Sequence, residues 1–539
     1  MLSIPSLKPL TAVFILCGLA IPFIFLGIGQ YGVVGTDEAF YQDIALGMLA
    51  SGNFLELRSG GAIYVYDTFA NAPLQYWARA GVAAILGKSM FSMRILSALS
   101  ALLTVLVSYR LVLYLGGRRA GFAAGVVLIT SFQFLYLHSA RTGELEPTVC
   151  LLLVSCALLF IRTIDDPSRH WWPHHLLLAV LFNLKAPIIV IPVAAELIAF
   201  AVIASARPRL AGWLGWGCAV LPIAVLWHGY QAFQYPDQVR SVFTAVGHQM
   251  AGDFAVGPKG GVFGRTLYYG QKLVFGGFPY VLIYPLAVIA AGRASLPSSG
   301  VDSQKRRGIL VLLVYLFTIF AFYLGISKVG PWYIVHAYPF LAALVGLYLG
   351  GRQVSREQSW HQLAVWGVVL SLLFWVTPQI AGYNPFSADA YVIPMLTFWR
   401  SVPAVGPEWG VPALALVIFA CLMAWRRSAK ESLPESLPLM LFVLFTGYGA
   451  IRCLAPLAYI HHLSPIAALD ADLQERVAVG SPLPFPLDVP RTHPWIVNYY
   501  FDQDFKLKVS AKEERAAYRK PMEYVLLGWK PGRKEQAGD

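Results

Sequence analysis

The stretch from Tyr31 to Trp77 organises the chain, and near its start lies TDEAFYQDIALGML (residues 36–49). It begins with two adjacent acids, and Phe40, Ile44 and Met48 then recur every four residues. This spacing puts the three side chains on one face of a helix. The sequence APLQYW (72–77) leads into a second amphipathic segment that ends near residue 86. Amphipathic helices lie in a membrane interface more readily than they span it.

The composition of the 539-residue chain is that of an integral membrane protein. Hydrophobic residues make up 57% and charged residues only 13%, whereas soluble domains carry about a quarter charged residues. The net charge of +12 does not indicate a nucleic-acid partner. The basic residues fall largely in short gaps between apolar runs, as the positive-inside rule expects of cytoplasmic links.

Apolar runs predict about thirteen transmembrane helices, each near the length that spans a bilayer. The expected spans are Leu10–Gly29, Ile95–Leu115, Gly121–Ala140, Pro147–Thr163, Leu176–Leu184, Pro187–Ala204, Gly212–Tyr230, Phe278–Ala291, Ile309–Ile326, Ile334–Leu349, Ala364–Ile380, Pro412–Trp425 and Pro438–Leu454. The links between spans that carry clusters of basic residues, among them Arg118-Arg119 and 305–307, all fall on one side of the membrane. By the positive-inside rule this side is cytoplasmic. The other face receives the first acidic loop, the 141–146 corner, the turn at Lys185, and loops at 231–277, 327–333 and 381–410.

Two domains are expected. Residues 1–455 form the membrane domain, whose catalytic outer loop covers about residues 30–90. From about residue 456 charged residues become frequent and prolines punctuate the chain. Two strand-like segments flank a helical one there, which predicts a small α/β domain at 456–539 on the outer face. The fold class is therefore an all-α polytopic membrane protein with interfacial helices and this appendage.

Charged residues at the membrane edge are the candidates for chemistry, because a charge inside the bilayer is costly and tends to be functional. Asp37 and Glu38 come first; the alternative is that they only favour the start of a helix through its dipole. The corner RTGELEP (141–147) brings Arg141 and Glu146 between two apolar runs. A solvated turn is the alternative interpretation of that corner.

Basic and aromatic residues on the same face are candidates for binding an anionic group. Lys185 follows an apolar run, and Lys328 stands in SKVGPWYIVHAYP (327–339), which also contains Tyr333 and His336. A lysine at a helix end can instead extend its amine to the interface. Arg265 lies in the long outer loop and is a further phosphate-binding candidate. No metal site is predicted, because the six cysteines form no Cys-x-x-Cys pair and no histidines show ligand spacing.

Taken in order, these motifs resemble the polyprenyl-phosphate-sugar glycosyltransferases of the C-type membrane fold. That group includes the lipid A aminoarabinose transferases and the protein O-mannosyltransferases. The resemblance rests on the acidic pair, PLQYW (73–77), the acidic corner, the Lys185 turn and the Ser-Lys motif, and it covers most of the chain from Asp37 to about Pro339. The aminoarabinose transferases carry a charged pair before the Pro-Pro-Leu, where this chain has Ala70-Asn71. The corresponding phosphate contact, and a metal site that uses the glutamate, are therefore not implied here.

The resemblance implies a function on the outer membrane face. A sugar would move from a polyprenyl-phosphate donor to a lipid, glycan or protein acceptor, with Asp37 as the catalytic acid of the first loop. Glu38 and Glu146 would orient hydroxyl groups, and Arg141, Lys328 and Arg265 would bind phosphate. No cofactor is expected, although a divalent metal stays open. The expected location is the bacterial inner membrane, with the site on its periplasmic side. Two alternatives are a flippase for lipid-linked sugars and a membrane scaffold without catalysis.

Overall fold

The computed structural model describes residues 9–30, 36–59, 62–63, 73–136, 138–236, 261–327, 329–330, 332–350 and 446. Its helices are α1 (Pro9–Phe25), α2 (Thr36–Ser51), α3 (Leu74–Leu86), α4 (Met90–Ile129), α5 (Phe132–Tyr136), α6 (Glu146–Asp165), α7 (Trp172–Phe182), α8 (Val190–Val202), α9 (Leu210–Gln234), α11 (Gly261–Gly277), α12 (Tyr284–Ala294), α13 (Ser303–Gly325) and α14 (Tyr338–Gly350). Short 3-10 helices are η2 (Ala186–Ile189), η3 (Ala204–Arg209), η4 (Tyr280–Leu282), η5 (Pro297–Ser299) and η6 (Tyr333–Ala337).

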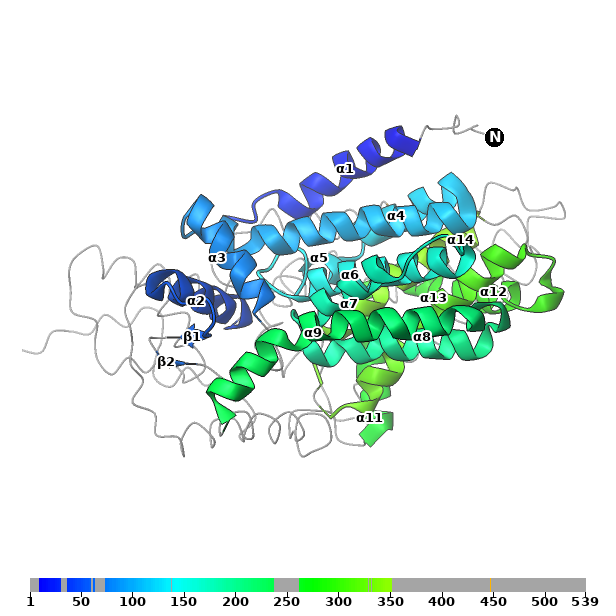
Figure 1. Ribbon diagram of the computed structural model, residues 1–539. Helices are drawn as coiled ribbons and strands as arrows, with labels where there is room; N and C mark the ends of the chain where they lie inside the picture. Colours follow the sequence, from blue (N-terminus) through cyan, green and yellow to red (C-terminus); the bar gives the residue numbers. More distant parts are fainter. Residues whose placement is uncertain are drawn as a thin grey trace, which may run out of the picture.

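The long helices form one bundle in which α4 is central. Helices α1, α6 and α14 pack against α4, while α8 packs on α13 and α7 on α9. Figure 1 shows these helices running side by side, with α2, α3 and a small hairpin gathered at one end of the bundle. The hairpin consists of β1 (Arg58–Ser59) and β2 (Ala62–Ile63), which pair antiparallel.

Five described helical stretches are long and apolar enough to cross a membrane: Met90–Ile129, Glu146–Asp165, Ala204–Gln234, Ser303–Gly325 and Tyr333–Gly350. Four shorter apolar helices accompany them, at Leu10–Phe25, Trp172–Phe182, Ala186–Val202 and Tyr280–Ala294. The prediction of a helical polytopic membrane protein is confirmed in this coarse form. Three of the thirteen predicted spans and the predicted α/β domain fall after residue 350, outside the described helices.

The two predicted spans at 95–115 and 121–140 correspond to two arms of α4. The arms meet at Gly117, whose φ of 83° and ψ of −177° are not helical and suit a residue without a Cβ. Beyond this point the arms pack closely, because a Cβ on Gly121 would come within 2.8 Å of the Tyr109 carbonyl oxygen. The second arm ends at Ile129 rather than residue 140.

Both amphipathic segments predicted from the first stretch are helices. They are α2 and α3, which pack against each other. The predicted face of α2 is buried, since Phe40 is 6% exposed and Ile44 and Met48 are inaccessible. In contrast, the outer segment predicted as a loop at 231–277 contains the C-terminal end of α9 and the helix α11.

Candidate active site

The two acids of the first stretch occupy the first turn of α2, where the helix dipole stabilises negative charge. Their environments differ. Asp37 is partly exposed, whereas Glu38 is completely buried. The guanidinium group of Arg94 donates to both carboxylate oxygens of Glu38, with Nη2–Oε1 at 2.8 Å and Nε–Oε2 at 3.1 Å. The backbone N–H of Gly143 donates to Oε2 at 2.8 Å. The protein itself therefore engages the Glu38 carboxylate, and Asp37 is the acid of the pair that is open to a substrate.

Gly143 is held by hydrogen bonds at both its backbone N–H and its backbone carbonyl. Its N–H donates to Glu38, and its carbonyl oxygen accepts a hydrogen bond from Nη2 of Arg79 at 2.6 Å. The other guanidinium nitrogen of Arg79 donates to the Met93 carbonyl at 2.8 Å. Arg94 also donates to the carbonyl of Ile28, just after α1. We call Glu38, Arg79, Arg94 and Gly143 the arginine clamp, because it ties α1–α4 to the segment that precedes α6.

We expect Gly143→Ala to lower the turnover of the protein, because the added methyl group has no room. It would come within 3.0 Å of Cβ of Glu38 and of Cγ and the carbonyl oxygen of Met93. Such overpacking costs about 1–3 kcal/mol and shifts the neighbouring backbone. Turnover and melting temperature would be measured beside Gly81→Ala in α3, where a Cβ meets nothing within 4 Å. Wild-type turnover in Gly143→Ala would show that the clamp does not position the site.

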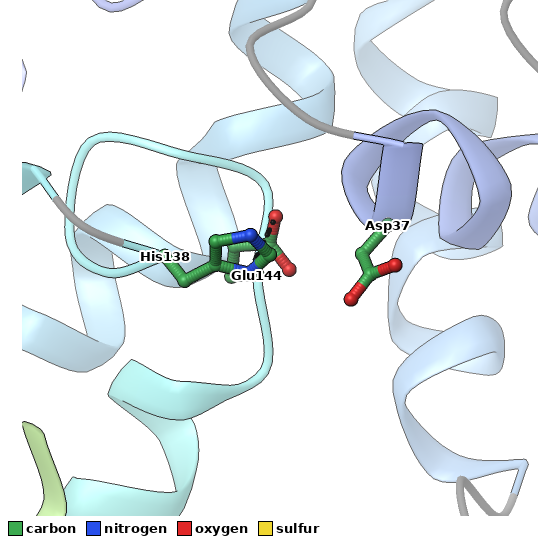
Figure 2. A group of neighbouring side chains, drawn as sticks. All are labelled: Asp37, His138 and Glu144. Carbon is green, nitrogen blue, oxygen red and sulfur yellow. Dashed lines mark ion pairs between the residues drawn. The ribbon is translucent and has the colours of Figure 1, made fainter. Parts of the chain in front are cut away.

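The segment that the clamp holds brings a histidine and an acid toward Asp37. Nδ1 of His138 lies 3.2 Å from Oε1 of Glu144, and the imidazole ring stacks on Trp332 with 4.1 Å between centroids. Burial opposes the imidazolium, but the negative charges of Glu144, Asp37 and Glu146 outweigh it and raise the pKa of His138 to about 9. Figure 2 shows the carboxylate of Asp37 across from the His138–Glu144 pair.

His138 adopts a left-handed backbone conformation. Its φ of 49° lies in the left-handed region, which is uncommon for residues other than glycine. Such conformations cluster at functional sites, where the surrounding structure enforces them. The ligand atoms of Asp37, His138 and Glu144 all lie within 4.8 Å of one another. Among the described residues, these three could converge on a single metal ion.

A second group of polar residues, the Lys185–Glu146 ion pair with Tyr333 and His336, adjoins the group of Asp37, His138 and Glu144. Nζ of Lys185 lies 2.8 Å from Oε1 of Glu146, and the same amine sits over the ring of Tyr333 at 5.4 Å from its centroid. Tyr333 stacks on Tyr323, whose hydroxyl group hydrogen-bonds to Nδ1 of His336. The structure thus brings together four residues that were predicted separately as site residues.

Two predicted phosphate-binding arginines have other partners. The guanidinium group of Arg141 donates to the carbonyls of Phe23, Ile24 and Leu26 at the end of α1, and it is completely buried. Nε of Arg265 donates to the Leu324 carbonyl in the last turn of α13. Helix ends leave such carbonyls without intrahelical partners. These contacts hold both guanidinium groups at helix ends, and phosphate binding by either arginine stays a prediction. Lys328 lies outside the described residues.

Comparisons with known proteins find relatives of this chain in sequence. The family model for dolichyl-phosphate-mannose-protein mannosyltransferases matches residues 70–228. An undecaprenyl phosphate-alpha-4-amino-4-deoxy-L-arabinose arabinosyl transferase of Pseudomonas savastanoi pv. phaseolicola is 33% identical over 126 residues, which cover 23% of each chain. An uncharacterized protein of Aquifex aeolicus is 23% identical over 378 residues, or 69% of this chain and 70% of that protein.

The fold has a clear counterpart among solved structures. ArnT from Cupriavidus metallidurans bound to undecaprenyl phosphate is similar with a TM-score of 0.64 and 19% identity, over 91% of this chain and 85% of that one. Its apo structure gives a TM-score of 0.63. These findings confirm the predicted resemblance to the polyprenyl-phosphate-sugar glycosyltransferases of the C-type membrane fold. Among the proteins named here, ArnT is the one whose structure this chain follows over most of its length.

Proposed function

We propose that the protein transfers a sugar from a polyprenyl-phosphate donor to an acceptor on the outer face of the membrane. One observation carries this proposal. Asp37 faces the His138–Glu144 pair, and the Lys185–Glu146 pair adjoins them. These acids and bases come from separate elements: Asp37 begins α2, which lies with α3 at one end of the helix bundle (Figure 1), and Glu146 begins α6. The likeness to a structure that contains undecaprenyl phosphate supports a donor of this class.

The chemistry needs few protein groups, because a sugar joined to a lipid phosphate already carries a leaving group. An acceptor oxygen attacks C1 of the sugar and forms the new bond, while the bond from C1 to the phosphate oxygen breaks. Asp37 accepts the proton of the acceptor, and the polyprenyl phosphate leaves with the bonding electrons. Positively charged side chains oriented in advance stabilise the charge that develops on the phosphate. Lys185 and Lys328 are the proposed sources of that charge, as charge-assisted hydrogen bonds are strong.

The remaining predicted residues take supporting roles. Glu38 is proposed to position Asp37, since Arg94 and Gly143 occupy its carboxylate. Glu146 orients Lys185, and it keeps a second carboxylate oxygen, Oε2, without a hydrogen-bond partner in the described structure. Tyr333 and His336 line the donor side of the site. The site is proposed to open to the periplasm of a bacterial inner membrane.

Label transfer tests the proposal directly. The full-length protein in lipid nanodiscs would be incubated with a panel of radiolabelled undecaprenyl-phosphate sugars and with total envelope lipids, glycans and proteins as acceptors. We expect one donor to label one product class, and Asp37→Asn to abolish that labelling. If no donor transfers its sugar while the reconstituted protein moves the intact labelled lipid across a bilayer, the flippase alternative holds instead.

A further inference from the structure

We propose that Asn183 is a positioning residue for Lys185 and holds this lysine where the donor phosphate would bind. The inference rests on the proposed function, in which Lys185 supplies positive charge to that phosphate. Asn183 is the C-cap residue of α7 and stands two positions before Lys185. It acts through the backbone between the two residues, because its own hydrogen bonds go to the surrounding helices.

The side-chain amide of Asn183 joins two helices. Nδ2 donates one hydrogen bond to the Ala179 carbonyl in the last turn of α7, at 3.0 Å, and another to the Ala224 carbonyl in α9, at 2.9 Å. The first bond lies within α7, whereas the second crosses to a residue 41 positions later. The neighbouring ring of Phe182 packs on His228 of α9, with 4.8 Å between the ring centroids. Two adjacent residues thus fix the end of α7 against α9.

The backbone of Asn183 reaches a third element. Its carbonyl oxygen accepts a hydrogen bond from the N–H of Leu74 at 3.2 Å, and Leu74 is the first residue of α3. The first N–H groups of a helix have no partner within the helix, so this contact satisfies one of them. Helix α3 also carries Arg79 of the arginine clamp. Asn183 therefore joins the turn at Lys185 to a helix that the clamp already holds.

The turn itself is tight, so a shift of Asn183 moves Lys185 with it. The N–H of Lys185 donates to the Leu181 carbonyl at 2.8 Å, and the Lys185 carbonyl accepts from the N–H of Ile188 at 3.0 Å. These bonds give the turn its shape, and the bonds of Asn183 fix where it lies relative to α9 and α3. The amine of Lys185 then reaches Glu146 at 2.8 Å. Such placement matters in a site, because a misplacement of about 1 Å can cost about 10²-fold in rate.

Two substitutions separate the bond within α7 from the bond to α9. Asn183→Leu keeps a similar volume and removes both donors. Asn183→Ser keeps a hydroxyl group, which can donate to the Ala179 carbonyl four residues earlier. This side chain is one atom shorter, so it no longer reaches the Ala224 carbonyl in α9. If Asn183 acts by positioning the turn, both variants should have the same defect.

The test measures binding of a lipid phosphate rather than sugar transfer. The probe is radiolabelled farnesyl phosphate, a short polyprenyl phosphate. Its binding to the full-length protein in nanodiscs would be followed by scintillation proximity, with empty nanodiscs subtracted. We expect Asn183→Leu and Asn183→Ser each to weaken binding by about 3–10-fold, the range that corresponds to one hydrogen bond.

The matched control is Ser295→Ala at the C-cap of α12. Oγ of Ser295 donates to the Gly292 carbonyl in the last turn of that helix at 2.6 Å, and it is partly buried, as Asn183 is. Helix α12 lies at the opposite end of the bundle from α2 and α3 (Figure 1). Ser295→Ala loses a comparable bond at a helix end and should bind farnesyl phosphate as the wild type does.

A double-mutant cycle separates positioning from a general loss of structure. Lys185→Gln removes the charge but keeps a donor for Glu146, and it should weaken binding more than either Asn183 variant. In the Lys185→Gln background, Asn183→Ser should change binding by less than about twofold, because its effect passes through the lysine. Additive losses in the cycle would overturn the proposal. Wild-type binding in folded Asn183→Ser, or binding that does not depend on Lys185, would do the same.

The two proposals fail separately. A protein that transfers no sugar but shows the coupling between Asn183 and Lys185 keeps this inference and loses the transferase. Sugar transfer by Asn183→Ser with wild-type affinity for farnesyl phosphate would leave the transferase and remove the positioning role.

Discussion

Asp37→Asn should reduce turnover by about 10²–10⁴-fold, which is the usual contribution of a general base. Asparagine keeps nearly the same shape but cannot accept the proton of the acceptor. Turnover would be measured at saturating donor, so that a change in donor binding does not enter the result. Donor affinity should change little, because the proposed phosphate contacts belong to lysines.

The matched control for Asp37→Asn is Asp166→Asn in an exposed link, which should retain full turnover. The melting temperature of Asp37→Asn should stay near that of the wild type, since the side chain is partly exposed and pairs with none of the arginines of the clamp. Full turnover on the true acceptor would remove Asp37 as the base. Asp37 would then orient an acceptor that is already ionised, or it would only stabilise the N-terminus of α2.

Local patterns in the sequence predicted the elements that carry the site. The period of Phe40, Ile44 and Met48 indicated the helix that presents Asp37, and the apolar run after Glu146 indicated α6. These signals are local because helix formation and burial of one face depend on residues a few positions apart. Lys185 and Glu146 were both predicted as site residues, but their ion pair was not. The two residues are 39 positions apart in the sequence, and no hydrophobic periodicity indicates a contact over that separation.

The residues that sequence reasoning missed lie where helices meet. Arg94 sits one position before a predicted span, and Arg79 lies within an amphipathic helix, so each looked like an ordinary polar residue at a helix boundary or face. Both are buried in the structure. A charged side chain among apolar neighbours is the signal that could have found them. His138 carried no comparable signal, because its role depends on a backbone turn and on Trp332 from a distant segment.

Arg94→Met should lower the free energy of unfolding by about 3–5 kcal/mol, the usual effect of removing one partner of a buried ion pair. Both side chains of the Arg94–Glu38 pair are completely inaccessible, so the carboxylate would remain in the interior without its partner cation. Thermal melting in nanodiscs measures the loss. The exposed pair of Arg169 and Asp166 is the matched control, since its side chains are 41% and 45% exposed. Arg169→Met should melt near the wild-type temperature because solvent screens such pairs.

Adding Glu38→Leu to Arg94→Met separates stability from function. Replacing both partners of a buried pair by apolar groups is often close to neutral for stability, so the double variant should regain much of the lost melting temperature. The N–H of Gly143 nevertheless loses its acceptor in Glu38, and of the arginine clamp only the hydrogen bond from Arg79 to the Gly143 carbonyl remains. Turnover should therefore stay low in a protein that has become stable again. If turnover returned together with stability, the clamp would serve folding alone, and the position of Glu144 would be set by its other contacts.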